Sequence, residues 1–580
     1  MSGLERRLAV ARGDEPADLV LRGGRVFSVF TREWLDTSLA IVDGYVAGLG
    51  DYDGTEVMDV PGRYLVPGFI DSHMHLESPK LLPDEFARLV VPLGTTAVVA
   101  DPHEIANVLG TDGVHWLLDF CGDLPLDVYF MAPSCVPASR FESPRRPLTI
   151  GDLEGLLRRT HVLGVAEMMN FPGVVAGDES ELAKVRLSRH VDGHAPGLLG
   201  KPLNAYAASG IRSDHEAITA EEGRERLRAG IWLLIREASM ARNLEALVPL
   251  VQELGPAHIA FCTDDRDPED IAEDGHINGM VRKAVAAGVR PEDALVCASL
   301  NPAMWHGLLE HGALAPGFRA DVVVLTDLEE FRPELVLKRG RPLGEIERPD
   351  VPEWVRQTVR PAPVGWEDLT VPSDGGEIRV IGLVPDQVVT ESLVDTPTVV
   401  DGFAVADPAR DLAKIAVIER HLATGRVGIG FVRGSGLRRG ALGSTVAHDA
   451  HNIVVLGASD EDMLAVVERL VALGGGNVVV DGGRVVAECP LPVAGLLSDA
   501  PLAAVIDQSS ACNEAAAALG WTGQTPFLTT SFLALSVIPS LKITDQGLVD
   551  VDRFEIVPLA VGSEARDSRI PAPSSPGRPD

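Results

Sequence analysis

The stretch that decides the fold is "LVPGFIDSHMH", residues 65–75. A short apolar run ends there in two histidines, His73 and His75, which are separated by one residue. Because alternate side chains of a strand point to the same side, both imidazoles face one way. Such a pair either opens a polar surface loop or forms half of a metal site, and the segments that follow decide between the two.

From residue 67 to residue 317, short apolar runs alternate with helical stretches. A repeated strand–helix alternation over roughly 250 residues is typical of a (β/α)8 barrel, so we expect that fold here. After the first strand, further strands are expected over 95–104, 126–135, 162–171, 203–209, 231–237 and 257–265. Helices are expected over 83–93, 111–121, 150–161, 179–189, 221–230, 244–255 and 276–288.

The segments outside the barrel have their own patterns. Residues 1–66 read as short strands with tight turns, and residues 318–345 return to strand character, so both flanks are expected to build one small β-sandwich domain. The Pro-rich passage 346–369 predicts a linker, and 370–565 predicts an additional α+β domain. The tail 566–580 has the composition of a disordered segment.

Composition and charge exclude several classes of partner. The chain of 580 residues carries a formal net charge of −33, which repels nucleic acid phosphates and anionic membranes. Its six cysteines form no C-x-x-C pair, which fits reduced thiols better than a disulfide framework. The N-terminus lacks the apolar core of a signal peptide, and no apolar run is long enough to span a membrane. We therefore expect a soluble, cytoplasmic protein.

Polar residues follow most of the predicted strands, where a (β/α)8 barrel places its active site. Besides His73 and His75 these are Asp101, His103, Glu104, Glu167, His194, His215, Asp264 and Asp265. Taken singly, each is more often a cap or a satisfied turn residue. Taken together, they supply enough nitrogen and oxygen ligands for two divalent ions. The absence of thiolates from the set favours a catalytic hydrolase metal over a closed structural site.

Several long motifs carry a family resemblance. "VPGFIDSHMH" resembles the opening metal motif of the amidohydrolase superfamily, and "SLNPAMWHGLLEHGALAPGFRADVVVL" resembles its closing segment. Within that superfamily, "GTTAVVADPHEIANVLG", "AEMMNFPGV", "DGHAPGL", "SDHE" and "CTDDRDP" are similar to bacterial adenine deaminases. "GSTVAHDAHNIVVLG" and "SFLALSVIPSLKITDQGLVDV" resemble the C-terminal domain of that family. The resemblance runs over nearly the whole chain.

The resemblance implies an activity and a cofactor. The implied reaction is hydrolytic deamination of adenine to hypoxanthine and ammonia by a metal-activated hydroxide, a step of purine salvage or catabolism. The implied cofactor is a binuclear centre of Mn²⁺ or Fe²⁺, with Zn²⁺ possible, because mixed histidine and carboxylate sites accept all three. By analogy with the superfamily, a homo-oligomer is expected, with a dimer favoured.

The resemblance also implies a role for each ligand. His73 and His75 would bind the first metal, and His194 and His215 the second. Glu167 would bridge the two, where many relatives carry a carboxylated lysine. Asp264 would ligate the first metal and handle the proton as general base and then acid.

Other assignments stay open. Glu104 is the candidate for contacting or protonating the purine ring, with His103 beside it. Asp265 competes with Asp264 for the catalytic role. Adjacent side chains of a strand face opposite sides, and we prefer Asp264 because it comes first after "FCT".

The C-terminal string "AHDAHN" is rich in possible ligands and supplies His448, Asp449 and His451 as candidate substrate-binding residues, besides His103, Glu104 and Asp265. It could close over the barrel mouth, bind an extra ion or satisfy a domain interface.

Three alternative functions have to be weighed. The metal set alone also allows another amidohydrolase, acting on a cyclic amide or a 6-substituted purine. A non-catalytic amidohydrolase-like scaffold is the second alternative, although such proteins typically lose ligands. Zinc nucleobase deaminases use H-x-E with a distant P-C-x-x-C, and the chain has the first string at His75–Glu77 but no C-x-x-C. That class is excluded.

Overall fold

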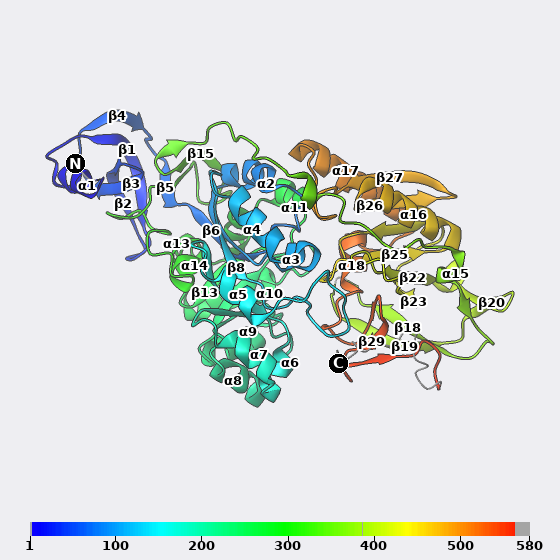
Figure 1. Ribbon diagram of the computed structural model, residues 1–580. Helices are drawn as coiled ribbons and strands as arrows, with labels where there is room; N and C mark the ends of the chain where they lie inside the picture. Colours follow the sequence, from blue (N-terminus) through cyan, green and yellow to red (C-terminus); the bar gives the residue numbers. More distant parts are fainter. Residues whose placement is uncertain (1–2, 386, 563–580) are drawn as a thin grey trace, which may run out of the picture.

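The computed structural model describes residues 3–385 and 387–562, so the tail predicted over 566–580 lies outside the described residues. Three parts follow one another across the molecule (Figure 1). An N-terminal sheet lies at one end, a central body of strands and helices (residues 69–305) occupies the middle, and a C-terminal body (residues 371–557) lies at the other end.

The central body is built on eight parallel strands. They are β6 (Phe69–Met74), β7 (Thr95–Ala100), β8 (Asp127–Ala132), β9 (Val162–Met168), β10 (Val191–Gly193), β11 (Ser213–Asp214), β12 (Trp232–Arg236) and β13 (Ile259–Cys262). They pair in the orders β10-β9-β8-β7-β6 and β11-β12-β13. The backbone N–H of Asp264, just after β13, donates to the carbonyl of His73 at 3.0 Å and joins the second group to β6. The result is a curled parallel sheet.

Helices connect the strands and cover the sheet, which explains why a strand such as β7 is buried along its whole length. They are α2 (Pro83–Val90), α3 (His103–Leu109), α4 (Thr111–Phe120), α5 (Ile150–Leu156), α6 (Phe171–Ala176), α7 (Glu179–Val185), α8 (Gly200–Ala208), α9 (Ala220–Arg228), α10 (Leu244–Leu254), α11 (Pro268–Asp274), α12 (Ile277–Ala286), α13 (Pro291–Ala298) and α14 (Leu300–Trp305).

The strand expected over 203–209 is wrong, because these residues belong mostly to helix α8. Leu203, Tyr206 and Ala207 are its buried residues, and the spacing of three and four is that of one helix face. The true strands on either side, β10 and β11, have only three and two residues. Strands that short show no periodicity in the sequence.

The N-terminal sheet takes strands from both flanks of the central body, as expected. Its strands are β1 (Ala17–Ser28), β2 (Glu33–Val42), β3 (Tyr45–Leu49), β4 (Gly54–Asp59), β5 (Tyr64–Pro67), β14 (Val322–Leu325), β15 (Pro333–Lys338) and β16 (Arg341–Pro342). They form one hydrogen-bonded sheet of eight, in which β14 pairs antiparallel with β5. The expected sandwich is therefore a single continuous sheet, with helix α1 (Gly3–Arg12) against β2 and β3.

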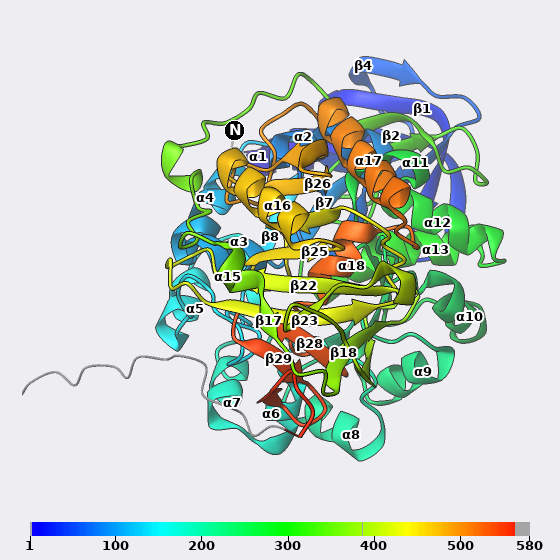
Figure 2. The ribbon, with the colours of Figure 1, turned by 90° about the vertical axis from the view of Figure 1, so that its right-hand side faces the viewer.

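The C-terminal body contains a second sheet of eight strands. In spatial order they are β19 (Thr390–Asp395), β18 (Ile378–Leu383), β23 (Val427–Arg433), β22 (Leu412–Ile418), β25 (Ile453–Gly457), β24 (Ala441–Ser444), β26 (Gly476–Asp481) and β27 (Arg484–Pro490). Helix α16 (Asp460–Leu473) packs on β24–β26, and α17 (Leu502–Leu519) packs between β26–β27 and the helices α2 and α11. Figure 2 views the molecule from this side, with the C-terminal strands in front of the central body.

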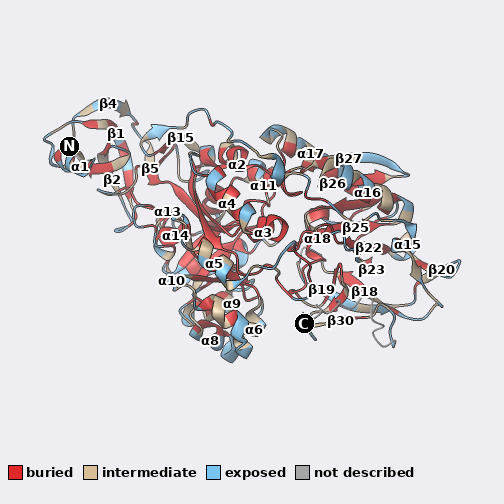
Figure 3. Cartoon of the chain, in the orientation of Figure 1, coloured by how far each residue is buried: buried red, intermediate tan, exposed pale blue. Residues whose placement is uncertain are grey.

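Smaller elements complete the C-terminal body. They are α15 (Trp366–Leu369), β17 (Val371–Pro372), β20 (Thr398–Val400), β21 (Phe403–Val405), α18 (Pro526–Phe532), β28 (Leu541–Thr544), β29 (Gly547–Asp550) and β30 (Glu555–Val557). Buried residues line the strands of the central body and the inner strands of the C-terminal sheet (Figure 3). Within the described part of the chain, no helix is both long and apolar enough to cross a membrane.

Candidate metal centre and substrate cavity

Glu167, near the end of β9, is the centre of the candidate site. Its Oε2 lies 2.7 Å from His194 Nδ1 and 3.3 Å from His215 Nε2. Its Oε1 lies 3.6 Å from His75 Nε2 and 3.8 Å from His73 Nε2. All five side chains are buried. Four histidines from three different strand ends thus converge on one carboxylate, as the strand-end pattern predicts.

Asp264 completes this group in an unusual backbone conformation. Its φ is +57°, so the chain leaves strand geometry directly after β13. Its Oδ1 lies 3.1 Å from His75 Nε2, and its Oδ2 lies 2.7 Å from Arg236 Nη1. Alternation no longer holds at this point, and both Asp264 and Asp265 line the same cavity. The expectation that these two adjacent side chains face opposite sides is therefore wrong.

Arg236 and Glu216 are site residues that sequence reasoning missed. Arg236 ends β12 and forms ion pairs with both Glu216 and Asp264, and all three side chains are buried. Burial by itself raises the pKa of Asp264, but Arg236, followed by His75 and His215, holds that pKa well below its usual range. The run "IWLLIRE" was expected to be a strand, so reading its last residues would have found Arg236.

The donor atoms fit a divalent metal centre. His73 Nε2, His194 Nδ1 and Glu167 Oε2 are buried and have no hydrogen-bond partner of good geometry. Unsatisfied buried polar atoms are costly, so their concentration in one place points to a shared cation. The donor atoms of His73, His75 and Asp264 lie within 4.8 Å of one another, and so do those of His73, Glu167 and His215. Imidazole and carboxylate donors suit manganese, iron and zinc.

A second group of polar residues lies beside this centre, at the contact with the C-terminal body. His103 Nδ1 is 3.0 Å from Asp101 Oδ2 and 3.7 Å from Glu167 Oε1. On the other side of the ring, His103 Nε2 is 3.7 Å from Asp449 Oδ1. His103 therefore lies between the candidate metal centre and the C-terminal body.

The C-terminal segment contributes directly to the site. His448 Nδ1 lies 3.3 Å from Glu104 Oε1, and its Nε2 lies 3.8 Å from Asp265 Oδ2. His448 and Asp449 line the cavity, but Glu104 and His451 are not among the lining residues. Glu104 contacts His448, which does line the cavity. Glu104 could therefore act on a purine ring only indirectly, by way of the His448 imidazole.

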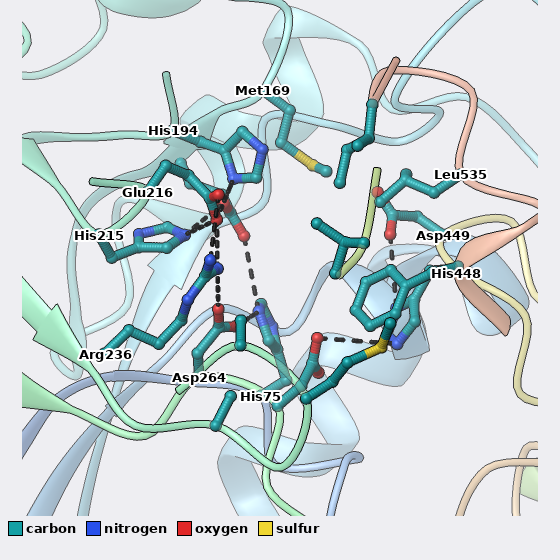
Figure 4. Close-up of a pocket in the computed structure, with 18 of the residues that line it drawn as sticks. His75, Met169, His194, His215, Glu216, Arg236, Asp264, His448, Asp449 and Leu535 are labelled. Carbon is teal, nitrogen blue, oxygen red and sulfur yellow. Dashed lines mark hydrogen bonds and ion pairs between the residues drawn. The ribbon is translucent and has the colours of Figure 1, made fainter. Parts of the chain in front are cut away.

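The cavity itself is small, with a volume of about 40 Å³. Figure 4 shows His194, His215, Glu216 and Arg236 on one side and His448, Asp449 and Leu535 on the other. The apolar lining of the cavity comes from both the central and the C-terminal body and includes Met169, Met240, Val388, Phe532 and Leu535. The Phe532 ring stacks on His448 with centroids 4.8 Å apart. A polar metal-ligand side and an apolar side suit a flat, partly polar ring.

Comparisons with known proteins agree with this geometry. Residues 64–343 match the model of the amidohydrolase family, and residues 387–555 match that of the adenine deaminase C-terminal domain. "Adenine deaminase 2" of Carboxydothermus hydrogenoformans is 45% identical over 97% of this chain and 100% of its own. The adenine deaminase of Oleidesulfovibrio alaskensis is 46% identical over 95% of this chain and 98% of its own.

A solved structure described as that of an adenine deaminase has a TM-score of 0.44 and 15% identity, covering 57% of this chain and 100% of that one. The resemblance drawn from the sequence motifs is confirmed by the two family models and the full-length relatives. Because such relatives align over almost its whole length, the chain belongs to the adenine deaminase family of amidohydrolases.

Proposed function

We propose that the chain hydrolyses adenine to hypoxanthine and ammonia. The observation that carries the proposal is the convergence of four buried histidines on Glu167 beside Asp264, in a chain whose full-length relatives are named adenine deaminases. The cavity lies directly against these residues and combines their polar groups with apolar side chains.

Two divalent ions would share the donor atoms around Glu167. His73 and His75 would hold the first, His194 and His215 the second, with Glu167 bridging and Asp264 completing the first. The spacing of these atoms supports the proposal. Mn²⁺ or Fe²⁺ are the proposed ions and Zn²⁺ also suits the donors. When bound, such ions supply the Lewis acidity that makes water nucleophilic near neutral pH.

The chain's own groups would handle the protons. Asp264 lies 3.1 Å from His75 Nε2 and is ionised beside Arg236, so it can take the proton of the attacking water. The water oxygen bonds to C6, the bond from C6 to the exocyclic nitrogen breaks, and Asp264 returns the proton to the leaving amine. The second proton of the water ends on N1, the ring nitrogen beside C6, as the C6–O bond becomes a carbonyl. Ammonia and hypoxanthine result.

His448 and Glu104 would act on the purine ring as a pair. Glu104 is buried against His448 Nδ1 and does not line the cavity, so we assign it the role of orienting His448. His103 would fix the positions of Asp101 and Glu167, and Asp265 that of His448. His451, which lies behind the His448 ring, would act only through it.

The same proposal covers the architecture. We infer that the eight parallel strands β6–β13 close into a (β/α)8 barrel over residues 67–317, flanked by a small domain of 1–66 and 318–345. A linker of 346–369 would lead to a C-terminal domain of 370–565. The backbone bond from Asp264 to His73 and the family-model ranges 64–343 and 387–555 support this division. A homo-oligomer and a cytoplasmic location stay predictions.

Ammonia release from adenine by the manganese-loaded protein tests the function. We expect turnover by the wild type and its loss in His75→Ala, because that imidazole lies beside both Glu167 and Asp264. Hydantoin and a dihydropyrimidine serve as cyclic-amide substrates and should not be hydrolysed. Absence of ammonia from adenine would contradict the proposal. Fewer than about one metal ion per chain after growth in manganese would favour the non-catalytic scaffold.

A further inference from the structure

Asp449 offers a buried hydrogen-bond acceptor to the cavity. It lies in the loop between β24 and β25, lines the cavity and is almost completely buried. Its Oδ1 faces His103 Nε2 at 3.7 Å and His448 Nδ1 at 3.5 Å, whereas its Oδ2 has no hydrogen-bond partner. Leaving a buried carboxylate oxygen unpaired is costly, so this oxygen is suited to receive a donor from a ligand.

The position of Asp449 relative to the candidate metal centre determines which edge of a bound ring faces this carboxylate. His103 separates it from Glu167, with one 3.7 Å contact on each side of the imidazole ring. In Figure 4, Asp449 lies across the cavity from His194 and His215. A ring whose reacting carbon lies against Asp264 and Glu167 therefore turns its opposite edge toward Asp449.

The chemistry of adenine matches that arrangement. Its reacting carbon, C6, is in the six-membered ring, and its single ring N–H is in the five-membered ring at the other end. Nucleosides and other N9-substituted purines lack this hydrogen. Burial by itself raises the pKa of Asp449, but His103 and His448 hold that pKa well below its usual range. The ionised side chain can only accept hydrogen bonds.

An extra metal ion is a weaker explanation of this cluster. The side chains of Glu104, His448 and His451 offer donor atoms within 4.8 Å of one another. However, His451 Nδ1 accepts the backbone N–H of Ala447 at 3.2 Å. The proton of the neutral ring must then be on Nε2, which leaves that nitrogen without a lone pair for a metal.

Building on the proposed function, we propose that Asp449 accepts the ring N–H of adenine and thereby selects the free base over N9-substituted purines. The C-terminal body then supplies a specificity-determining residue, while the central body supplies the metal ligands. The apolar side chains of Phe532 and Leu535, from the same C-terminal body, line the cavity beside it.

Two substrates and two variants test this role. The substrates are adenine and its isosteric analogue with a ring oxygen in place of N9–H, which keeps the reacting amine but lacks the donor. In Asp449→Ala, kcat/KM for adenine should fall by about 10- to 100-fold, mainly through KM, as expected for loss of a hydrogen bond to a charged group. For the oxygen analogue, kcat/KM should change by less than about threefold. Asp449→Asn keeps an uncharged acceptor oxygen, so its loss of kcat/KM on adenine should be smaller than that of Asp449→Ala, again with little change on the oxygen analogue.

Controls separate this role from a structural one. Asp545→Asn removes a buried carboxylate at the same interface but outside the cavity, and it should affect both substrates equally. Metal content per chain and the thermal midpoint are measured for every variant. Equal losses on the two substrates, or no loss on adenine, would overturn the role of Asp449 alone. A wild type that releases no ammonia from adenine would overturn the proposed function and this inference with it.

Discussion

At the scale of single residues, Glu167 is the side chain on which the site depends most. Its two oxygens are shared among His73, His75, His194 and His215, so in the proposed centre a neutral amide would not replace the carboxylate between two cations. We expect Glu167→Gln to retain less than half of the wild-type metal per chain and to lose at least about 10³-fold in kcat, a loss typical of removing transition-state electrostatics. Elemental analysis and ammonia release measure the two effects.

The matched control for this variant is Glu181→Gln on α7, which removes a carboxylate paired with Lys184 at 2.9 Å. It should keep both metal and activity. Wild-type metal content in Glu167→Gln would contradict the bridging role.

Arg236 is the second decisive residue, because it neutralises two buried carboxylates. Arg236→Met leaves Glu216 and Asp264 facing each other without a cation. Removing one partner of a buried ion pair typically costs about 3–5 kcal/mol, so we expect a loss of that size in the free energy of unfolding of metal-depleted protein. Urea denaturation measures it. Added Mn²⁺ should restore part of the loss, and a variant as stable as the wild type without metal would contradict this account.

The histidines and Glu167 could be predicted because strand alternation and strand ends are readable in a sequence. Asp265 could not be placed, since its position follows from the left-handed backbone of Asp264, which the letters "TDD" do not reveal. Arg236 is at the end of the expected strand "IWLLIRE", but the sequence does not show that its guanidinium is buried. Its burial depends on Glu216 and Asp264, which come from two other strands.

At the scale of elements, helix α18 forms part of the apolar side of the cavity. Its last residue, Phe532, stacks on His448 and lines the cavity. Phe532→Ala should raise the KM for adenine by about fivefold or more, because burying an aromatic ring against a substrate is worth about 1–3 kcal/mol. Metal content should be unchanged. Phe554→Ala, which packs on Phe141 outside the cavity, is the control and should leave KM unaltered.

Strand β28 contains a buried lysine with a distinctive pH dependence. Lys542 Nζ donates to the carbonyls of Val388, at 2.7 Å, and Phe532, at 3.1 Å. Burial lowers the pKa of Lys542 from 10.5 to about 7. Between these two values the unfolded chain binds one more proton than the folded chain, so the lysine makes stability rise with pH.

The corresponding prediction compares wild type with Lys542→Met. Their difference in free energy of unfolding, wild type minus variant, should increase by about 2 kcal/mol between pH 7 and pH 9. Urea denaturation at the two pH values measures it. Lys201→Met, on the surface of α8, removes the same charge and corrects for the change in net charge. A difference that stays constant or shrinks with pH would show that Lys542 is charged in the folded protein.

Element prediction succeeded where elements were long and failed where they were short. Strands such as β7 and β8 have six residues and strong apolar runs, so their positions follow from the sequence. β10 and β11 are strands because they hydrogen-bond to neighbouring strands, β10 to β9 and β11 to β12, and not because of a pattern in their own residues. Tertiary pairing of this kind is not encoded in local periodicity.

At the scale of the whole molecule, the site joins the two larger bodies. The central body supplies Glu167 and its histidines, and the C-terminal body supplies His448 and Asp449. Further contacts hold the bodies together away from the cavity, such as Ser143 Oγ to Asp545 at 2.8 Å and Ser509 Oγ to Glu269 at 2.9 Å. The presence of a C-terminal body could be predicted from the sequence. Which of its residues line the cavity depends on how the C-terminal body packs against the central body, and only the structure shows that packing.

Metal removal should therefore destabilise both bodies together. Chelation leaves the buried histidines and carboxylates around Glu167 without a cation. Because His103 contacts both Glu167 and Asp449, we expect the resulting destabilisation to extend to Asp449 in the C-terminal body. We expect the thermal midpoint to fall by several degrees in a single transition, since a ligand present at 100 times its Kd stabilises the fold by about 2.7 kcal/mol. Calorimetry with and without dipicolinate measures the change, together with ammonia release, which should be lost.

Re-addition of metal gives the control. Mn²⁺ should restore the midpoint and the activity, whereas Mg²⁺, which prefers oxygen ligands in octahedral geometry, should not. His75→Ala should show a smaller chelator-induced shift than the wild type, because it has lost the ligand closest to Asp264. Two separate transitions, of which chelation moves only one, would show that the metal centre stabilises the central body alone. The C-terminal body would then line the cavity, but metal binding would not raise its thermal stability.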